Sequence, residues 1–264
     1  MQLGMSIFAG VSPEEMVKGF LRNGILHTFV MSDHPDFDTF MTLFRENGIT
    51  CDNLHAPFKG INAMWGEDEA AAETMLAKLK DSVDKCAKYG IPATVLHVSS
   101  GRPMPEITER GLARYRQIVN YAVSKNVMPV LENLRFAENL AVLMEKFPEC
   151  GFCWDNGHQA CCTPDVQYLK LYGHRLAALH IQDNRAELDT DDHLLPFDGN
   201  IDFTQVAADL AASGYRGTLM LEVGKVAHAG DVYPYRDMTE AEYMDLAASS
   251  VKKLNEMIEN SRKG

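Results

Sequence analysis

The chain has 264 residues, with 37 Asp and Glu against 25 Lys and Arg, a formal net charge of −12, and 46% hydrophobic residues. This composition is that of an ordinary globular protein. The acidic balance argues against nucleic acid or an anionic membrane as the main partner, because a field of this sign repels polyanions. We therefore expect neither a membrane nor a nucleic acid as partner.

The N-terminal residues resemble no targeting signal. They read MQLGMSIFAG, with no Lys or Arg before Lys18 and no long apolar core. No uncharged apolar run approaches the roughly 18 to 20 residues that span a bilayer. Six cysteines are too few for a disulfide-stapled fold of this size. We expect a cytoplasmic protein with reduced thiols, including Cys150 and Cys153, whose CxxC spacing in a strand points them to opposite faces.

Short β-rich runs alternate with helical stretches along the whole chain. The strands are expected at residues 4–9, 26–31, 50–55, 93–98, 128–132, 151–155, 177–181 and 218–223. Helix starts are indicated where a capping Ser or Thr precedes Pro or an acidic turn, at Ser12, Thr163 and Thr239. Residues 67–89 carry apolar side chains at helical spacing, and Gly90 ends that helix.

Eight such units predict an α/β fold, a (β/α)₈ TIM barrel in which residues 1–264 form a single domain. The main rival is a doubly wound open sheet. That fold usually carries a Gly-rich phosphate loop, and neither GxGxxG nor GxxxxGK[ST] occurs here. The barrel is therefore the preferred fold.

Six consecutive predicted strands end in a histidine or an acid, at the end of the barrel where active sites collect. They are His55, His97, Glu132, Asp155, His180 and Glu222. A single polar strand end is usually a satisfied rim residue. Several carboxylates converging on an apolar barrel mouth would repel one another unless a cation neutralised them. The pattern predicts a divalent metal.

Two loops add further groups of the ligand type. His158 follows Asp155 by three residues, and Asp191 and His193 lie in a turn-rich loop after the seventh strand. Taken individually, Asp183 and Asp192 are expected to be solvated surface charges. Phe8, Phe58 and Trp65 are candidates for an apolar wall, although packing is the commoner role of such aromatics.

Together these motifs resemble the xylose isomerase-like TIM-barrel superfamily, which contains sugar isomerases and epimerases as well as type IV abasic-site endonucleases. The motifs are Leu54-His55-Ala56-Pro57, Leu131-Glu132-Asn133, Trp154-Asp155-x-x-His158, His180-Ile-x-Asp183 and Asp191-x-His193 running to Gly199-x-Ile201-Asp202. In order and at strand ends, they are fairly specific for the superfamily and much less specific for one activity.

The resemblance to the ketose 3-epimerase branch implies one divalent metal held by Glu132, Asp155, His180 and Glu222, with Glu132 and Glu222 also acting as the acid/base pair. It further implies substrate contacts from His158 and Glu138. Arg185 falls one position out of register with a substrate-binding Arg of that branch. The full substrate-binding set that we expect is His158, Glu138, Arg185, His55 and His97.

The endonuclease branch implies a different site, with three zinc ions on nine ligands. All nine residue types are present, as His55, His97, Glu132, Asp155, His158, His180, Asp191, His193 and Glu222. The loop sequences Asp155-Asn-Gly-His158 and Leu195-Pro-Phe-Asp-Gly-Asn-Ile-Asp202 are more similar to the sugar branch. We find no basic stretch with interleaved aromatics of the kind that grips a duplex.

The expected activity is therefore that of a metal-dependent sugar or sugar phosphate isomerase or epimerase, working by proton transfer through an enediolate. Three carboxylates and one histidine suit Mn²⁺, Mg²⁺ or Co²⁺, whereas more histidines would favour Zn²⁺. If the sugar is phosphorylated, Lys225 is placed to neutralise the phosphate. The alternatives are a trinuclear-zinc phosphodiesterase on abasic DNA and a non-catalytic sugar- or metal-binding barrel. A homo-oligomer is compatible with the sequence but not required by it.

Overall fold

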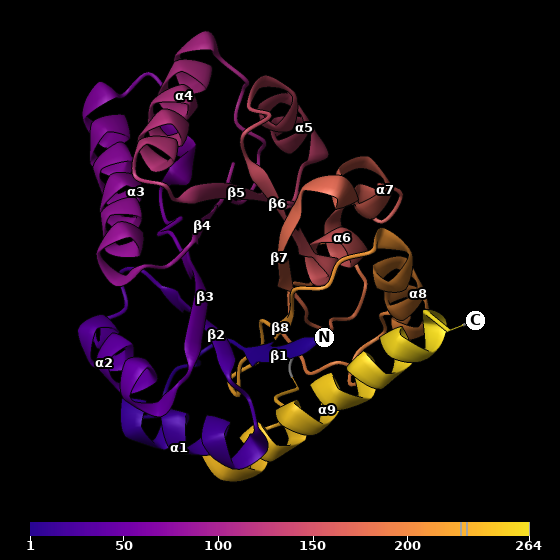
Figure 1. The fold of residues 1–264 in the computed structure, drawn as a ribbon. Helices are drawn as coiled ribbons and strands as arrows, with labels where there is room; N and C mark the ends of the chain where they lie inside the picture. Colours follow the sequence, from indigo (N-terminus) through magenta and orange to yellow (C-terminus); the bar gives the residue numbers. More distant parts are fainter. Residues whose placement is uncertain (228, 231, 264) are drawn as a thin grey trace.

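Eight parallel strands form the centre of the computed structural model, which describes residues 1–227, 229–230 and 232–263 (Figure 1). The strands are β1 (Gln2–Met5), β2 (His27–Met31), β3 (Thr50–His55), β4 (Ala93–Leu96), β5 (Met128–Glu132), β6 (Gly151–Asp155), β7 (Leu176–His180) and β8 (Thr218–Leu221). They pair in the order β7-β6-β5-β4-β3-β2-β1-β8. A parallel bridge between Ile181 and Leu221 joins the two outer strands. The sheet therefore closes into the (β/α)₈ barrel that the sequence predicts.

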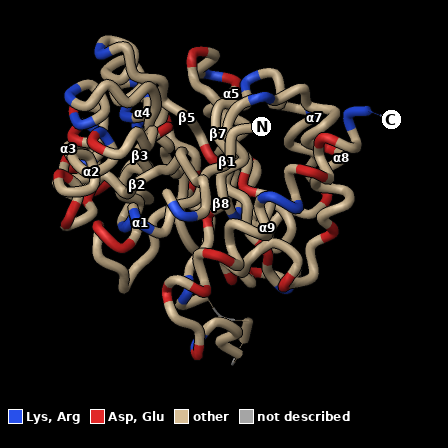
Figure 2. Tube along the Cα trace, turned by 60° about the horizontal axis from the view of Figure 1, so that its bottom comes forward, with Lys and Arg blue, Asp and Glu red and all other residues tan. Residues whose placement is uncertain are grey.

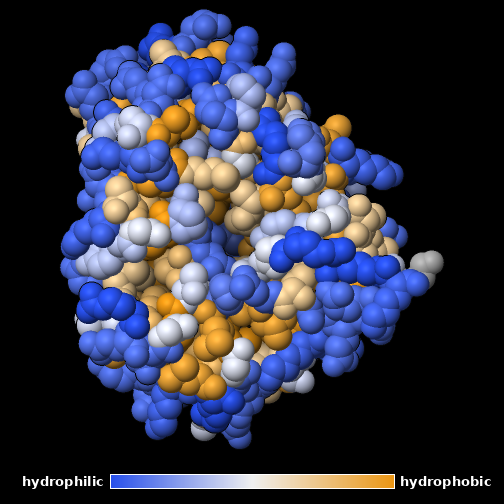
Figure 3. Space-filling model, viewed as in Figure 1, coloured by the Kyte–Doolittle hydropathy of each residue, from blue (hydrophilic) through white to orange (hydrophobic). Residues whose placement is uncertain are grey.

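Nine α-helices of the described residues surround this barrel (Figure 1). They are α1 (Pro13–Asn23), α2 (Phe37–Asn47), α3 (Glu69–Tyr89), α4 (Glu109–Ser124), α5 (Ala137–Lys146), α6 (Asn156–Cys162), α7 (Tyr168–Tyr172), α8 (Phe203–Ser213) and α9 (Glu240–Ser261), with short 3₁₀ turns η1 (Ile61–Met64) and η2 (Gly173–Arg175). Hydrophilic residues dominate the helical rim in Figure 3, and hydrophobic residues lie toward its centre. Among these described helices, none has the length and apolar character to cross a membrane.

Helix ends follow the expected capping chemistry at two of the three predicted starts. The Ser12 side chain accepts a hydrogen bond from the backbone of Glu15 and begins α1. Thr239 and Glu242 form a complete capping box at the start of α9. Thr163 does not begin a helix as predicted: it ends α6 instead, and the chain turns before α7.

A small apolar layer fills the barrel below its carboxyl-terminal end. Val95, Val130, Cys153 and Ala178 form it on four neighbouring strands, each buried. Side chains two residues apart point to the same face of a strand. His97, Glu132, Asp155 and His180, two residues further along those strands, therefore stand directly above this layer. Cys150 packs in the outer core rather than in this layer, and all six cysteines are free thiols.

Candidate metal centre at the barrel mouth

The barrel brings four buried or half-buried ligand-type side chains to one point. Glu132, Asp155 and His180 end β5, β6 and β7, and Glu222 directly follows β8. One ligand atom of each lies within 4.8 Å of the others. Barrel closure places the last of them, because the backbone of Glu222 donates to the Ile181 carbonyl at 2.9 Å, next to His180.

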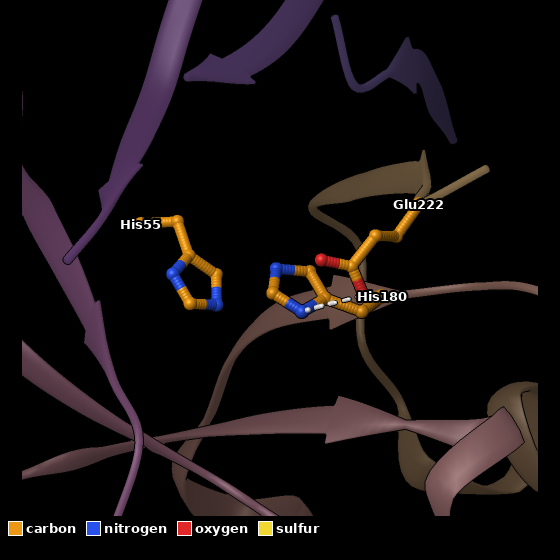
Figure 4. A group of neighbouring side chains, drawn as sticks. All are labelled: His55, His180 and Glu222. Carbon is orange, nitrogen blue, oxygen red and sulfur yellow. Dashed lines mark ion pairs between the residues drawn. The ribbon is translucent and has the colours of Figure 1, made fainter. Parts of the chain in front are cut away.

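The His180 ring lies between two carboxylates of this group. Its Nδ1 lies 3.2 Å from Glu132 Oε1 and 3.3 Å from Glu222 Oε2. Figure 4 shows the ring between His55 and Glu222, with the ion pair to Glu222 dashed. Phe29 stacks on the same ring at 4.8 Å between centroids, and His55 stacks on it at 5.6 Å. The imidazole is thus held with one nitrogen toward the two carboxylates.

Several buried polar atoms of this group and of the neighbouring His158 make no hydrogen bond within the described part of the chain. They are Glu132 Oε2, Asp155 Oδ2, His158 Nδ1 and His180 Nε2. Buried oxygen and nitrogen atoms almost always make a hydrogen bond, so several that make none, at one place, require an explanation. A divalent cation is the partner that carboxylate oxygens and an imidazole nitrogen share. The donor set therefore fits a divalent metal ion.

A second group shares Glu132. His55 and His97 direct their Nε2 atoms at Glu132 Oε2, at 3.4 and 3.2 Å. These three residues also meet the spacing of a cation site. Phe58 stacks on His97 at 4.3 Å between centroids, and both residues line the cavity described below.

The start of α6 positions His158. Asp155 caps this helix, and its Oδ1 accepts the backbone N–H of His158 at 2.7 Å. The His158 ring then lies between two acids, with Nδ1 3.3 Å from Glu132 Oε1 and Nε2 3.1 Å from Asp191 Oδ2. One residue, Asp155, thereby offers an oxygen to the candidate cation and orients a neighbouring histidine.

The loop after β7 is built on two buried side chains. Gln182 donates to Asp191 Oδ1 at 2.8 Å and accepts the backbone N–H of His193 at 3.0 Å. The Asp183 carboxylate accepts four backbone N–H groups further along the loop and beside it, those of Asn184, Phe197, Gly199 and Ile201. Asp183 is fully buried, and Asp192 is buried against Arg185. The expectation that both are solvated surface charges is therefore wrong.

The pKa values of the buried groups at the mouth are shifted by burial and by one another. Burial raises the pKa of Asp155 to about 7 despite the nearby His158, and the charges of Glu222 and Glu132 add to the rise. Burial opposes ionisation of Glu132 as well, but His180 and His97 outweigh it and hold its pKa well below the ordinary value. Although burial lowers the pKa of His180, the surrounding anionic groups raise it well above its usual range. The raised pKa of Asp155 shows that burial and neighbouring carboxylates disfavour its charged form, and the raised pKa of His180 shows that a positive charge is favoured at this point.

A cavity of about 320 Å³ opens above these residues. It is lined by Met31, His55, Phe58, His97, Ser100, Gly101, Glu132, Arg135, His158, Asp191, His193 and Glu222. All nine histidines and acids that the sequence singled out at strand ends and in these loops thus meet in one network, with Asp155 and His180 beneath the cavity. Of the three aromatic wall candidates, Phe58 alone lines it; Trp65 is buried against Tyr115, and Phe8 against Tyr243.

Two predicted substrate contacts lie away from the cavity. Glu138, in the first turn of α5, lines a neighbouring depression. The Arg185 guanidinium is paired with Asp192 at 3.1 Å. Sequence reasoning missed Arg135, which lines both the cavity and that depression. Its only signal is its position three residues after Glu132.

Comparison with known proteins agrees with this architecture. The family model described as "Xylose isomerase-like TIM barrel" matches residues 16–254, and the chain belongs to this family. The uncharacterized protein y4fM of Sinorhizobium fredii (strain NBRC 101917 / NGR234) is 30% identical over 200 residues. That match covers 70% of this chain and 61% of the relative, so the chain spans less than two thirds of the relative's length.

Solved structures share the fold at low sequence identity. An L-ribulose 3-epimerase superposes with a TM-score of 0.79 at 16% identity, covering 99% of this chain and 95% of that one. A D-psicose 3-epimerase from Clostridium cellulolyticum H10 gives 0.75 at 14% identity, with 97% and 99% covered. A xylose isomerase domain protein from Alicyclobacillus acidocaldarius subsp. acidocaldarius gives 0.73 at 20%, with both chains fully covered.

Proposed function

We propose that this protein is a divalent-metal-dependent isomerase or epimerase of a sugar or sugar phosphate. The observation that carries the proposal is the convergence of Glu132, Asp155, His180 and Glu222 within 4.8 Å at the mouth of a closed barrel. The cavity above them, about 320 Å³, is of the size that holds a small ligand. The similarity to 3-epimerases of L-ribulose and D-psicose supports a ketose as substrate.

The four residues would hold one Mn²⁺, Mg²⁺ or Co²⁺ ion, or alternatively Zn²⁺. Such an ion supplies Lewis-acid stabilisation of the negative charge that develops on substrate oxygens. The chain itself supplies the oxygen-rich pocket, the apolar layer beneath it and the orientation of each ligand.

Glu222 and Glu132 are the proposed acid/base pair. Glu222 Oε2 faces His180, and the Glu222 side chain lines the cavity. Glu132 approaches the cavity from β5, across the mouth from β8. One carboxylate would take the proton from the carbon beside the ketose carbonyl, and the other would return a proton to the enediolate. Delivery to the same carbon from the opposite face gives epimerisation. Delivery to the former carbonyl carbon, with loss of the hydroxyl proton from the first carbon's oxygen, moves the carbonyl and gives isomerisation.

His158, His55 and His97 line the cavity and are proposed to contact substrate oxygens. The substrate contacts of Glu138 and Arg185 remain predictions, and neither residue lines the cavity.

We place the protein in the cytoplasm, in line with its six free cysteines. A homo-oligomer also stays a prediction.

A second function, a zinc phosphodiesterase on abasic DNA, has one observation in its favour. His55, His97 and Glu132 form a second cation-spaced group beside the first. The charge pattern opposes it, because Lys and Arg are interspersed with Asp and Glu along the trace rather than gathered into a basic face (Figure 2). The sugar reaction is therefore the preferred function.

The test is proton exchange in D₂O with a panel of ketoses and ketose phosphates. The wild-type protein with Mn²⁺ is expected to place deuterium on the carbon beside the carbonyl. Glu132→Gln and Glu222→Gln should each lower this rate at least about 100-fold, the usual minimum for a lost acid or base. Asp209→Asn, on α8 and outside the cavity lining, is the control. Cleavage of an abasic oligonucleotide without exchange would favour the phosphodiesterase, and sugar binding without exchange a non-catalytic barrel.

A further inference from the structure

Arg135 is the one arginine that lines the candidate active-site cavity, among the residues that the structure describes. Its side chain is about a quarter exposed, and it makes only two long ion pairs, 3.5 Å to Asp189 and 3.9 Å to Asp191. Within the described chain, no hydrogen bond reaches its guanidinium. A guanidinium has five N–H donors, so this one retains nearly its full binding capacity.

Both acids near Arg135 have closer partners. Asp189 is held by Arg102 at 2.7 Å. Asp191 is held by Gln182 at 2.8 Å and by His158 at 3.1 Å. Removal of Arg135 would leave each carboxylate bound, so neither acid accounts for an arginine at this position. The guanidinium is therefore a positive charge beside the cavity that neither carboxylate requires.

The cavity lining next to the metal centre adds polar groups of the same kind. Ser100 and Gly101 line the cavity with Arg135, and in the described residues neither the Ser100 hydroxyl nor the Gly101 N–H has a hydrogen-bond partner. Beside Arg135 the cavity thus offers two further hydrogen-bond donors without a partner, and the nearby Asp191 carboxylate is already bound by Gln182 and His158. Lys225, the residue we expected to meet a phosphate, instead pairs with Glu240 at 2.9 Å.

A short chain of contacts relates Arg135 to the metal centre. Arg135 faces Asp191, Asp191 contacts His158, and His158 contacts Glu132. The guanidinium therefore lies beyond the candidate ligands and is not one of them. A ketose whose carbonyl end lies at Glu132 and Glu222 would extend its far end toward such a neighbouring group.

We propose that the cavity selects a ketose with an anionic group, a phosphate ester or a carboxylate, at the end remote from its carbonyl, and that Arg135 binds this group. This inference rests on the proposed function and names its substrate class. Arginine suits the role because its planar fork matches the oxygens of carboxylate and phosphate in two parallel hydrogen bonds. Arg135 is a binding residue here and takes no part in proton transfer.

The experiment compares matched substrates in the D₂O exchange assay. D-fructose, D-fructose 6-phosphate and D-fructuronate differ only at the remote carbon, and D-ribulose with its 5-phosphate gives a five-carbon pair. The metal-loaded wild-type protein is expected to favour an anionic member over its neutral parent by about 10- to 100-fold in kcat/KM, the range of a charge-assisted pair. The phosphate and carboxylate arms then show which anion is preferred.

Variants separate binding from folding. Arg135→Gln should raise KM for the anionic substrate by about the same factor, with kcat and the neutral ketose little changed. Arg135→Lys keeps the charge and should restore part of the preference. Arg110→Gln, on the surface of α4, is the matched control. Urea unfolding of all three variants shows whether a loss of activity reflects loss of fold.

The results distinguish failure of the anionic substrate class from failure of the proposed reaction. Equal or faster exchange of the neutral ketoses, or an equal effect of Arg135→Gln on charged and neutral substrates, would overturn the anionic substrate class and leave the proposed reaction standing. Absence of exchange with every ketose, charged or neutral, would overturn both.

Discussion

At the scale of single residues, strand periodicity and barrel topology made most of the site predictable. Alternation fixes which side chains face the barrel interior, and parallel pairing brings all carboxyl ends to one edge. His55, Glu132, Asp155 and His180 each end a strand, and Glu222 follows one directly. Arg135 escaped prediction because it lies in the turn between β5 and α5, where no periodicity fixes the direction of a side chain.

The burial of Asp183 was not predicted for a related reason: its partners are backbone N–H groups that only the folded loop brings together. Asp183→Asn should lower the free energy of unfolding by about 2 to 4 kcal/mol, because an amide cannot accept all four N–H groups as the charged carboxylate does. Exchange activity should fall as well, since the same loop carries Asp191 and His193. Urea denaturation of the variant measures the first effect.

Asp192→Asn is a comparison within the same loop, because Asp192 contacts Arg185 rather than the four amides. It should destabilise the protein less than Asp183→Asn. Equal midpoints for the wild-type protein and Asp183→Asn would show that the buried carboxylate does not organise this loop.

At the scale of elements, helix ends were predictable where a cap and its first turn lie together in sequence. Strand ends depended on partners elsewhere in the chain. The predicted strand at residues 4–9 became β1 (Gln2–Met5), because its pairing with β8 begins at Gln2 and Thr218. Thr163-Pro164 carries a start signal, yet the preceding helix α6 reaches Cys162 and leaves Thr163 as its end. A capping motif in the sequence does not indicate where the preceding helix ends.

The capping box of α9 gives a prediction at this scale. Thr239→Ala removes the acceptor of the Glu242 N–H and should lower the free energy of unfolding by about 1 kcal/mol. Exchange activity should stay unchanged, because α9 covers the outer side of the barrel against α1 and α8 (Figure 1). The urea midpoint measures the loss. Thr239→Ser keeps the hydroxyl and should recover most of it; a loss as large for Ser as for Ala would contradict the cap.

At the scale of the whole molecule, part of the acidic composition is explained by the barrel mouth. Glu132, Asp155, Asp191 and Glu222, four of the 37 acids, meet in one network at the barrel mouth. The strain of gathering them is relieved if a cation binds the folded state only. Such binding stabilises by about 2.7 kcal/mol at a ligand concentration 100 times Kd. Chelation should therefore lower Tm, and Mn²⁺ should restore it.

Direct titration of the chelator-treated protein with Mn²⁺, Co²⁺ and Zn²⁺ tests the proposed metal centre most directly. We expect one Mn²⁺ or Co²⁺ ion per chain, and a loss of at least about tenfold in affinity for Asp155→Asn, since this change removes a charged ligand whose carboxylate is buried. His27→Asn, at the opposite end of the barrel, should bind as the wild-type protein does. Three tightly held Zn²⁺ ions, or no saturable binding of any divalent ion, would contradict a single-metal centre at the barrel mouth.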